Sequence, residues 1–557
     1  MRRRELLGAA AATLAACAAP PAVAPNAAER VRSVIAALTP EQRAGQLMSV
    51  AFHGGQITSA VEDMIRARGV GGVVLRAENA GDATALAKLC ADLQRIARDA
   101  KVPPLFLSID QEGGSVVRVG KGLTVLPSQM ALAATPDPAG AVRRAVQITA
   151  EELLASGVNW SFAPVADTNN EPLNPIIGNR SFGSDPQRVA SLVDTAVRTY
   201  AAAAFLCCAK HFPGHGAATV DSHVGLPLIG ADRARLDRVE LVPFRQAIAA
   251  GVPAIMVAHL IVPALDPTPS LPATLSRRIT TDLLRRELGF DGIAVTDDLE
   301  MGALASIGEA NAALLAVRAG ADHALFRFDE AAQRDGHRLI LDALRAGSLD
   351  AGPSLRRLLD AKLRYGILDR RAGRAPDASA NAAAALELAR QSITVVHNAG
   401  RALPLRGRVY AIATTAADLT PLPVDGDLAT ELSRSRADVT ARTFGRNVAD
   451  DVIDMAFADA QRADVVVAGV ADIGINDDQR RLVARLAASK PTVLVSLRGP
   501  YDALFAPNVA AWVCAYDGRV PSLRAAVEVI TGARRPVGAL PVTVSDRYPL
   551  GSGMRDL

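Results

Sequence analysis

The feature that most constrains the fold is a repeated alternation of short apolar runs with longer stretches of helical period. Short apolar runs bounded by turn residues are typical of buried strands, and the 3.6-residue period between them is typical of helices. The expected strands are 46–52, 70–75, 105–109, 158–165, 205–209, 254–258, 293–295 and 321–326. Eight strands alternating with helices predict an α/β fold that begins with a (β/α)8 barrel of the TIM type, here assigned to residues 29–370.

A second, smaller α/β domain is expected after the barrel. The composition shifts to Arg, Ala, Gly and Pro at the predicted linker, 371–381, and apolar runs alternate with helical stretches again in 382–557. The expected strands of this domain are 409–413, 439–444, 465–470, 492–497 and 510–515. Such runs predict a largely parallel sheet covered by helices. No glycine-rich phosphate-binding motif occurs there, so the sequence does not support a nucleotide-binding role.

The N-terminus predicts export. Three arginines at 2–4 precede a short apolar segment that ends Leu-Ala-Ala-Cys, which is typical of a secretory signal. Because a cysteine follows the small residues, we expect a lipoprotein signal at 1–17 with Cys17 as the lipidated residue, then a tether at 18–28. A plain cleaved signal with a chance cysteine is the alternative, and the Arg-Arg-x-Leu-Leu run also resembles a twin-arginine signal. The expected location is the periplasm or cell envelope, with membrane contact only through the lipid anchor.

Composition narrows the function classes. The net charge of +3 is small for 557 residues, and no basic stripe suggests a nucleic-acid partner. Cys207 and Cys208 are adjacent within an apolar run, so their side chains point to opposite faces and make a poor disulfide. Since no Cys-x-x-Cys spacing exists, we expect these two, with Cys90 and Cys514, to be buried small hydrophobic residues.

Charged residues stand at the ends of five consecutive expected strands. In chain order they are Asp110, Asp167, Lys210 with His211, His259, and Asp297 with Asp298. The carboxyl ends of the strands carry the active sites of β/α barrels, so the sequence predicts a site at this end. Side chains alternate along a strand, so at most one of Asp297 and Asp298 points into the barrel mouth. Asp297 is the better nucleophile candidate, and Asp298 is a candidate helix cap.

The stretch 205–223 carries the densest chemistry. If the two-residue spacing lets Asp221 orient the imidazole of His223, the pair forms an acid/base unit, whereas a simple loop hydrogen bond is the alternative. His211 and His215 flank a Pro-Gly turn and do not share a helical face, so no metal is expected. Four further residues together predict a pocket for a neutral, hydroxyl-rich molecule, although each taken alone favours a structural ion pair over a ligand contact. They are Asp110, Arg180, Lys210 and His211.

Several motifs together carry a family resemblance. D-Q-E-G-G, V-N-W-S-F-A-P-V-A-D, N-R-S-F-G, K-H-F-P-G-H-G, D-S-H and V-T-D-D-L-E-M occur in this order between about residues 110 and 301. The chain resembles glycoside hydrolase family 3, in its bacterial β-N-acetylglucosaminidase branch. S-I-T-V-V-H-N, L-P-L and G-A-L-P-V-T-V match more weakly and indicate a two-domain member.

The resemblance implies a retaining exo-hydrolase that removes terminal β-linked N-acetylglucosamine, with no cofactor or metal. Because an anchored enzyme meets peptidoglycan or its turnover products, we expect peptidoglycan fragments as the substrate. By position, Asp297 matches the nucleophile, and Asp221 with His223 matches the acid/base dyad. The four pocket residues named above match positions that hold the sugar hydroxyls and the N-acetyl group. Two departures are visible: Ala217-Ala218 replaces a usual Asp-Thr, and Ser115 stands where an arginine is common.

Other functions remain open on the same scaffold. A neutral histidine as acid/base lets phosphate attack the glycosyl-enzyme, which would make a phosphorylase. A β-glucosidase is disfavoured by the D-S-H loop, and a catalytically silent glycan-binding lipoprotein is disfavoured by the intact Asp297, Asp221 and His223. The second domain is expected mainly to shape the rim, with Asp517 as its candidate pocket residue. The oligomeric state is unknown.

Overall fold

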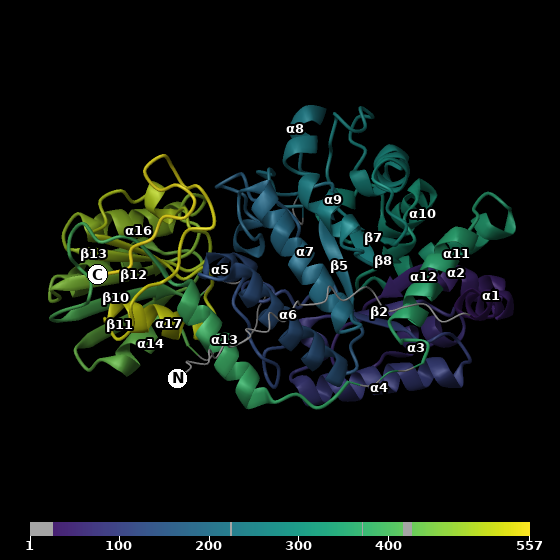
Figure 1. Cartoon of the computed structure of the whole chain (residues 1–557), viewed down its shortest axis with the longest axis horizontal. Coiled ribbons are helices and arrows are strands. Elements are labelled where there is room, and N and C mark those ends of the chain that lie inside the picture. The colour runs from purple at the N-terminus through teal and green to yellow at the C-terminus, as the bar shows by residue number, and fades with distance from the viewer. Residues whose placement is uncertain (1–25, 223–224, 370, 372, 416–425) are drawn as a thin grey trace, which may run out of the picture.

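The computed structural model describes residues 26–222, 225–369, 371, 373–415 and 426–557. Two bodies lie side by side along the longest axis of the molecule (Figure 1). The larger body holds the N-terminal two thirds of the chain, and the smaller holds the C-terminal third.

The predicted barrel is confirmed. Its strands are β1 (Met48–Val50), β2 (Gly72–Leu75), β3 (Phe106–Ile109), β4 (Trp160–Ser161), β5 (Leu206–Phe212), β6 (Ala254–Val257), β7 (Ile293–Asp298) and β8 (His323–Leu325). They pair in sequence order, all parallel, and the sheet closes where Ser49 of β1 lies opposite both Gly72 of β2 and Leu325 of β8. A closed parallel barrel has no open edge strand, and all eight carboxyl ends meet at one mouth.

Helices surround the barrel. They are α1 (Ala27–Ala37), α2 (Pro40–Gln46), α3 (Ser59–Arg66), α4 (Ala83–Asp99), α5 (Gln129–Ala134), α6 (Pro138–Ala155), α7 (Pro186–Ala202), α8 (Arg233–Arg238), α9 (Val242–Ala249), the π-helix Arg278–Glu287, α10 (Glu309–Ala319), α11 (Glu330–Arg345) and α12 (Gly352–Arg364). Most present one apolar side to the strands. In α4, for example, Leu86, Leu93 and Ala97 are fully buried, as the helical period predicts.

The second body is an α/β domain with a largely parallel sheet, as predicted. Its strands are β9 (Thr394–His397), β10 (Val409–Thr414), β11 (Val439–Phe444), β12 (Val465–Val470), β13 (Thr492–Ser496) and β14 (Ala511–Cys514), in the spatial order β11-β10-β12-β13-β14-β9. Only β9, which the strand pattern did not predict, runs antiparallel to its neighbour. The helices are α13 (Ala378–Ser392), α14 (Leu428–Ser435), α15 (Asp450–Ala460), α16 (Asp477–Ala487) and α17 (Val520–Ile530).

Two predicted connecting segments overlap helices at their carboxyl ends. The linker 371–381 includes the first turn of α13, because the side chain of Asp377 accepts a hydrogen bond from the backbone N–H of Ala380 and begins the helix there. The predicted tether 18–28 overlaps α1, which begins at Ala27. The domain limits themselves stay predictions.

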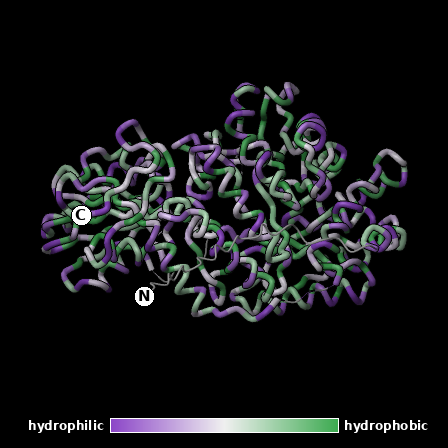
Figure 2. The backbone as a smooth tube through the Cα atoms, in the orientation of Figure 1, coloured by the Kyte–Doolittle hydropathy of each residue, from purple (hydrophilic) through white to green (hydrophobic). Residues whose placement is uncertain are grey.

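The interior consists of one large barrel core and two smaller cores on the two faces of the second sheet. In Figure 2 hydrophobic segments gather along the strands within each body. The short helix α5 belongs to both bodies: Leu132 and Ala133 pack in the barrel core, whereas Met130, Ala131 and Ala134 pack in a core of the second domain. All six residues of α5 are buried, so the two domains share this helix.

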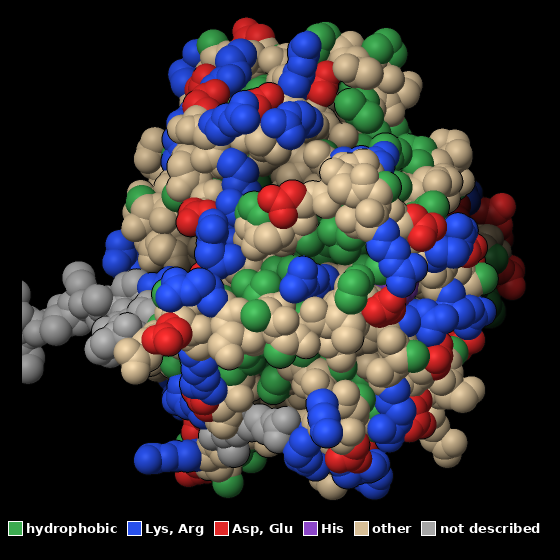
Figure 3. Space-filling model, turned by 90° about the vertical axis from the view of Figure 1, so that its right-hand side faces the viewer, with side chains coloured by type: hydrophobic (Ala, Val, Ile, Leu, Met, Phe, Trp, Pro, Cys, Tyr) green, Lys and Arg blue, Asp and Glu red, His purple; other side chains and the backbone are tan. Residues whose placement is uncertain are grey.

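The cysteines agree with the sequence expectation for them. Cys90, Cys207, Cys208 and Cys514 are buried and free of disulfides. On the face shown in Figure 3, basic and acidic side chains are interspersed. Within the described ranges, no helix combines the length and apolar character needed to cross a membrane.

Candidate active site

A cavity of about 520 Å³ opens at the carboxyl ends of the barrel strands. Its lining includes residues that follow or end most of the strands, namely Arg76, Asp110, Phe162, Lys210, His211, Met256, Asp297, Asp298, Leu325 and Arg327. Small-molecule sites in proteins occupy about 300–1,000 Å³, so this cavity has the size of a ligand site. It is also where a β/α barrel places its chemistry.

Lys210 is the centre of a buried charge cluster on one wall of the cavity. Its Nζ lies 2.8 Å from Asp110 Oδ1 and 2.7 Å from Glu112 Oε1. Arg180 donates two parallel hydrogen bonds of 2.9 Å to the Glu112 carboxylate. Arg118 Nη2 donates to Asp110 Oδ2 at 3.0 Å. Two predicted pocket cations therefore meet the predicted Asp110 and a second carboxylate, and bidentate pairing fixes the orientation of the guanidinium.

The charges of this cluster are locked in their ionised forms. Burial opposes ionisation of Asp110, but Lys210 and the arginines beside it outweigh burial and hold its pKa well below the usual value. Burial likewise opposes ionisation of Glu112, yet Arg180 and Lys210 lower its pKa to about 2. The ammonium of Lys210 is disfavoured by burial, but the two carboxylates raise its pKa. The wall therefore presents fixed donors and acceptors, which suit neutral hydroxyl groups.

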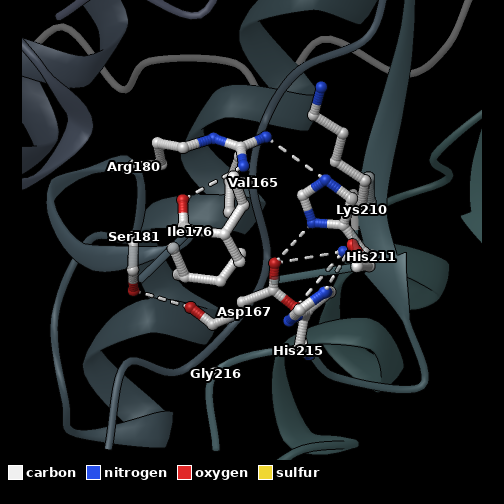
Figure 4. A network of polar contacts seen from close by, with 12 residues as sticks. Val165, Asp167, Ile176, Arg180, Ser181, Lys210, His211, His215 and Gly216 are labelled. Carbon is white, nitrogen blue, oxygen red and sulfur yellow. Dashed lines mark hydrogen bonds and ion pairs between the residues drawn. The ribbon is translucent and has the colours of Figure 1, made fainter. Parts of the chain in front are cut away.

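His211 is held in one orientation by Asp167. Its Nδ1 lies 2.7 Å from Asp167 Oδ2, and its Nε2 lies 3.3 Å from Arg180 Nη2 (Figure 4). Since Arg180 can only donate, this network assigns the neutral tautomer in which Nδ1–H donates to Asp167 and Nε2 accepts. The buried Asp167 also accepts backbone N–H groups of His211 and His215. Asp167 thus fixes the loop that follows β5.

His215 and the edge of the Asp221 loop form another part of the cavity lining. His215 Nε2 lies 3.1 Å from Ser222 Oγ, and burial together with His211 lowers the His215 pKa to about 4, so its imidazole is neutral near pH 7. Asp221 and Ser222 line the cavity. The predicted partner His223 lies outside the described residues, as does Cys17. Among the described residues, no cluster of three or more His, Cys, Asp or Glu side chains is suited to hold a metal.

Asp297 and Asp298 both line the cavity at the end of β7, with different surroundings. Asp298 Oδ2 lies 2.6 Å from Arg76 Nη2, and the backbone N–H of Asp298 donates to Asp297 Oδ1 at 2.8 Å. The expected helix cap is therefore wrong: Asp298 is an ion-pair partner and its Oδ1 accepts the N–H of Glu300 in a tight turn. His259 is buried, with contacts to Thr274 and the Asp298 carbonyl, so it supports β7.

Sequence reasoning missed several charged residues that line the cavity, among them Glu112, Arg76 and Arg118. Glu112 lies within D-Q-E-G-G, and its place two residues after Asp110 was the available signal, because both carboxylates reach Lys210. Arg76 follows β2. Arg118 contacts Asp110 from further along the same loop after β3. Neither arginine belongs to a motif, and their partners lie across the barrel or across a loop, so no local pattern signals them.

The two departures from the family pattern lie in identifiable surroundings. Ser115 Oγ and the Asn179 amide exchange hydrogen bonds of 2.9–3.0 Å, and Asn179 also donates to the Tyr516 carbonyl in the second domain. Ser115 is thus part of the contact between the domains. Ala218 is fully buried in the barrel core and Ala217 packs against that core. Alanines at 217 and 218 in place of Asp-Thr therefore make this part of the loop apolar.

Asp517 does not reach the cavity, so the candidate pocket residue of the second domain is wrong. Its side chain is fully buried and accepts the backbone N–H of Ser128 and of Arg519, both at 3.0 Å. It joins the barrel to the second domain. The residue of that domain that does line the cavity is Arg446.

A β/α barrel whose mouth holds several carboxylates beside a wall of fixed hydrogen-bonding charges has the architecture of a barrel enzyme. The model of the glycosyl hydrolase family 3 N-terminal domain matches residues 39–358. The chain therefore belongs to glycosyl hydrolase family 3, a family of glycoside hydrolases.

Individual relatives extend the similarity over both domains. A β-hexosaminidase A of Pseudoalteromonas piscicida is 32% identical over 561 residues, covering 87% of this chain and 91% of that protein. A β-hexosaminidase of Pseudomonas aeruginosa (strain LESB58) is 36% identical over 279 residues, covering 50% of this chain and 81% of that protein. The solved structure of a family 3 β-N-acetylglucosaminidase from Paenibacillus sp. str. FPU-7 superimposes with a TM-score of 0.87 at 35% identity, covering 91% of this chain and 99% of that one.

Proposed function

We propose that the protein is a retaining exo-β-N-acetylglucosaminidase that acts on peptidoglycan fragments ending in N-acetylglucosamine. The observation that carries the proposal is the single cavity in which Asp297 and Asp221 line the same space as the Lys210 charge cluster. The names of the relatives above support the sugar. Because the inner wall consists of ion-paired groups, a neutral sugar replaces water there without leaving an unpaired charge.

In the proposed mechanism Asp297 attacks the anomeric carbon of the terminal sugar while the glycosidic carbon–oxygen bond breaks. The imidazolium of His223, oriented by Asp221, gives its proton to the departing oxygen. Water then attacks the anomeric carbon of the glycosyl-enzyme, gives a proton to His223 and releases Asp297. Two displacements at one carbon return the β-configuration. The inner-wall charges do not titrate near neutrality, so the pH profile reports the groups that exchange protons.

Paired aryl glycosides test the reaction. We expect the intact chain to hydrolyse an aryl β-N-acetylglucosaminide at least about 100-fold faster, by kcat/KM, than the matching β-glucoside, since a site built to hydrogen-bond the acetamido group rejects a sugar without it. Proton NMR should show the β-anomer of free N-acetylglucosamine first. Rates that depend on added phosphate, with glycosyl phosphate as product, would instead establish a phosphorylase. A folded protein inactive on both glycosides would favour the silent binding lipoprotein.

We infer lipid-anchored export from the N-terminal sequence alone, with Cys17 as the modified residue. A cysteine directly after a small-residue segment behind an arginine-rich start supports it. We expect the full chain to fractionate with membranes in a bacterial host and the Cys17→Ser protein to leave the membrane fraction. Equal fractionation of the two proteins would contradict lipidation at this residue.

A further inference from the structure

The carboxyl edge of the second sheet faces the barrel. Arg498, just after β13, donates through Nη2 to the Pro175 carbonyl at 3.0 Å, and the Tyr501 hydroxyl lies 3.3 Å from Asn169 Nδ2. After β14, Asp517 accepts the N–H of Ser128. Ligands of parallel α/β sheets bind beyond the carboxyl ends of the strands. Here the carboxyl ends of both domains therefore point toward the same region.

The loop after β11 carries Arg446 into the lining of the barrel cavity. The Arg446 carbonyl accepts hydrogen bonds from Asn476 Nδ2 at 2.8 Å and from Gln479 Nε2 at 3.0 Å. Gln479 is almost fully buried, and its Oε1 accepts the backbone N–H of Ala471 after β12. The backbone at Arg446 is therefore fixed to the core of its own domain, which is what a positioned ligand contact requires.

The charges of the cavity differ between its depth and its rim. Lys210, Arg180, Arg76 and Arg118 all make close contacts with carboxylates at the inner wall. The exposed Arg446 guanidinium has no ion pair or hydrogen bond with any described residue, although it lines the same space. The cation at the rim is thus available to a ligand, whereas the inner cations are already neutralised.

A second arginine at the rim is also only loosely compensated. Arg327, two residues after β8, lies 3.8 Å from Asp298 and 3.9 Å from Glu300, beyond hydrogen-bond distance. Its guanidinium instead lies over the ring of Phe328, which stacks on His53 with 3.9 Å between ring centroids. The stacked rings hold Arg327 at the rim. At the rim, the barrel therefore contributes Arg327 and the second domain contributes Arg446.

We propose that Arg446 is a specificity residue that binds a carboxylate on the leaving group of the substrate. This inference rests on the proposed function, in which the terminal sugar occupies the inner wall and the leaving group extends toward the rim. The ligand class is a β-N-acetylglucosaminide whose second sugar carries an acidic substituent, such as the lactyl ether of muramic acid. A guanidinium at the rim is matched to a carboxylate in charge and in its two-pronged geometry.

Three disaccharides that differ only at the second sugar test the proposal: N-acetylglucosamine β-1,4-linked to N-acetylmuramic acid, its lactyl methyl ester, and the neutral diacetylchitobiose. In Arg446→Gln we expect kcat/KM for the acidic disaccharide to fall about tenfold, mainly through KM, because a charge-assisted hydrogen bond is lost. The two neutral disaccharides should change less than about twofold. Arg446→Lys should retain part of the preference, and added salt should reduce it.

Arg462→Gln is the matched control, since Arg462 is exposed in the same domain, does not line the cavity and has no ion pair with a described residue. Equal loss on acidic and neutral disaccharides, or loss on neither, would overturn the role of Arg446 while the aryl glycoside assay still supports the enzyme. A defect confined to phosphate-dependent cleavage would also overturn it and identify an acceptor site. If the unmodified chain shows no activity on any of these substrates, the proposed function itself is refuted.

Discussion

Asp297→Asn is expected to lower kcat on an aryl β-N-acetylglucosaminide by about four to six orders of magnitude, because Asp297 is the nucleophile of the proposed mechanism and an amide cannot form the glycosyl-enzyme. The amide oxygen can still accept the backbone N–H of Asp298, so the end of β7 should keep its geometry. We therefore expect an unchanged thermal midpoint and retained binding of N-acetylglucosamine, measured by calorimetry alongside steady-state rates.

External azide distinguishes loss of the nucleophile from general damage. In Asp297→Ala the missing carboxylate leaves space below the anomeric carbon of the bound sugar. Azide should enter this space and displace an activated aryloxide to give the α-glycosyl azide. Asp291→Asn, at an exposed position before the same strand, is the control and should leave kcat unchanged. Near-normal rates in Asp297→Asn would assign the nucleophile to another carboxylate of the cavity.

Glu112→Gln should have the largest effect on stability among conservative changes at this site. The substitution removes one charge that is 2% exposed and that contacts both Lys210 and Arg180. Removing one partner of a buried pair leaves an uncompensated cation and costs about 3–5 kcal/mol of unfolding free energy. Urea denaturation of the full chain, followed by the fluorescence of its two tryptophans, Trp160 and Trp512, measures this loss.

The activity of Glu112→Gln should also fall, by about 100-fold in kcat/KM, because Lys210 and Arg180 lose the contact that positions them. Glu78→Gln is the control: Glu78 lines the same cavity but is 41% exposed and contacts His53 at 3.2 Å. It should cost less than about 1 kcal/mol. Equal destabilisation by both substitutions would show that the buried cluster is not a special source of stability.

The barrel was predictable because its strands are buried on both sides and therefore appear as continuous apolar runs. The ends of those runs were less predictable. The run 158–165 forms only Trp160–Ser161 as a strand, although an isolated bridge still pairs Val165 with Lys210. The edge strand β9 was missed because the four residues of Thr394–His397 resemble many short apolar segments outside sheets.

At the site, strand order alone brings several of the predicted residues into one cavity. Asp110, Lys210, His211 and Asp297 meet because parallel strands share one carboxyl edge. Arg446 was not predictable in this way, since its place depends on how two domains pack, which no periodicity encodes. Asp517 illustrates the converse error: it follows a strand of the second domain, but domain packing buries it against Ser128.

The helix shared between the two cores has a consequence for how substrate enters. Opening the cavity by rotating the domains apart would pull either Met130 and Ala131 or Leu132 and Ala133 out of an apolar interior and expose them to water. The shared helix α5 therefore opposes such a rotation and favours a preorganised rim. Under the proposed function, the free end of a glycan enters a chamber whose walls the domain junction holds in place, so chain-end selectivity becomes a mechanical property of that junction as well as a chemical property of the pocket.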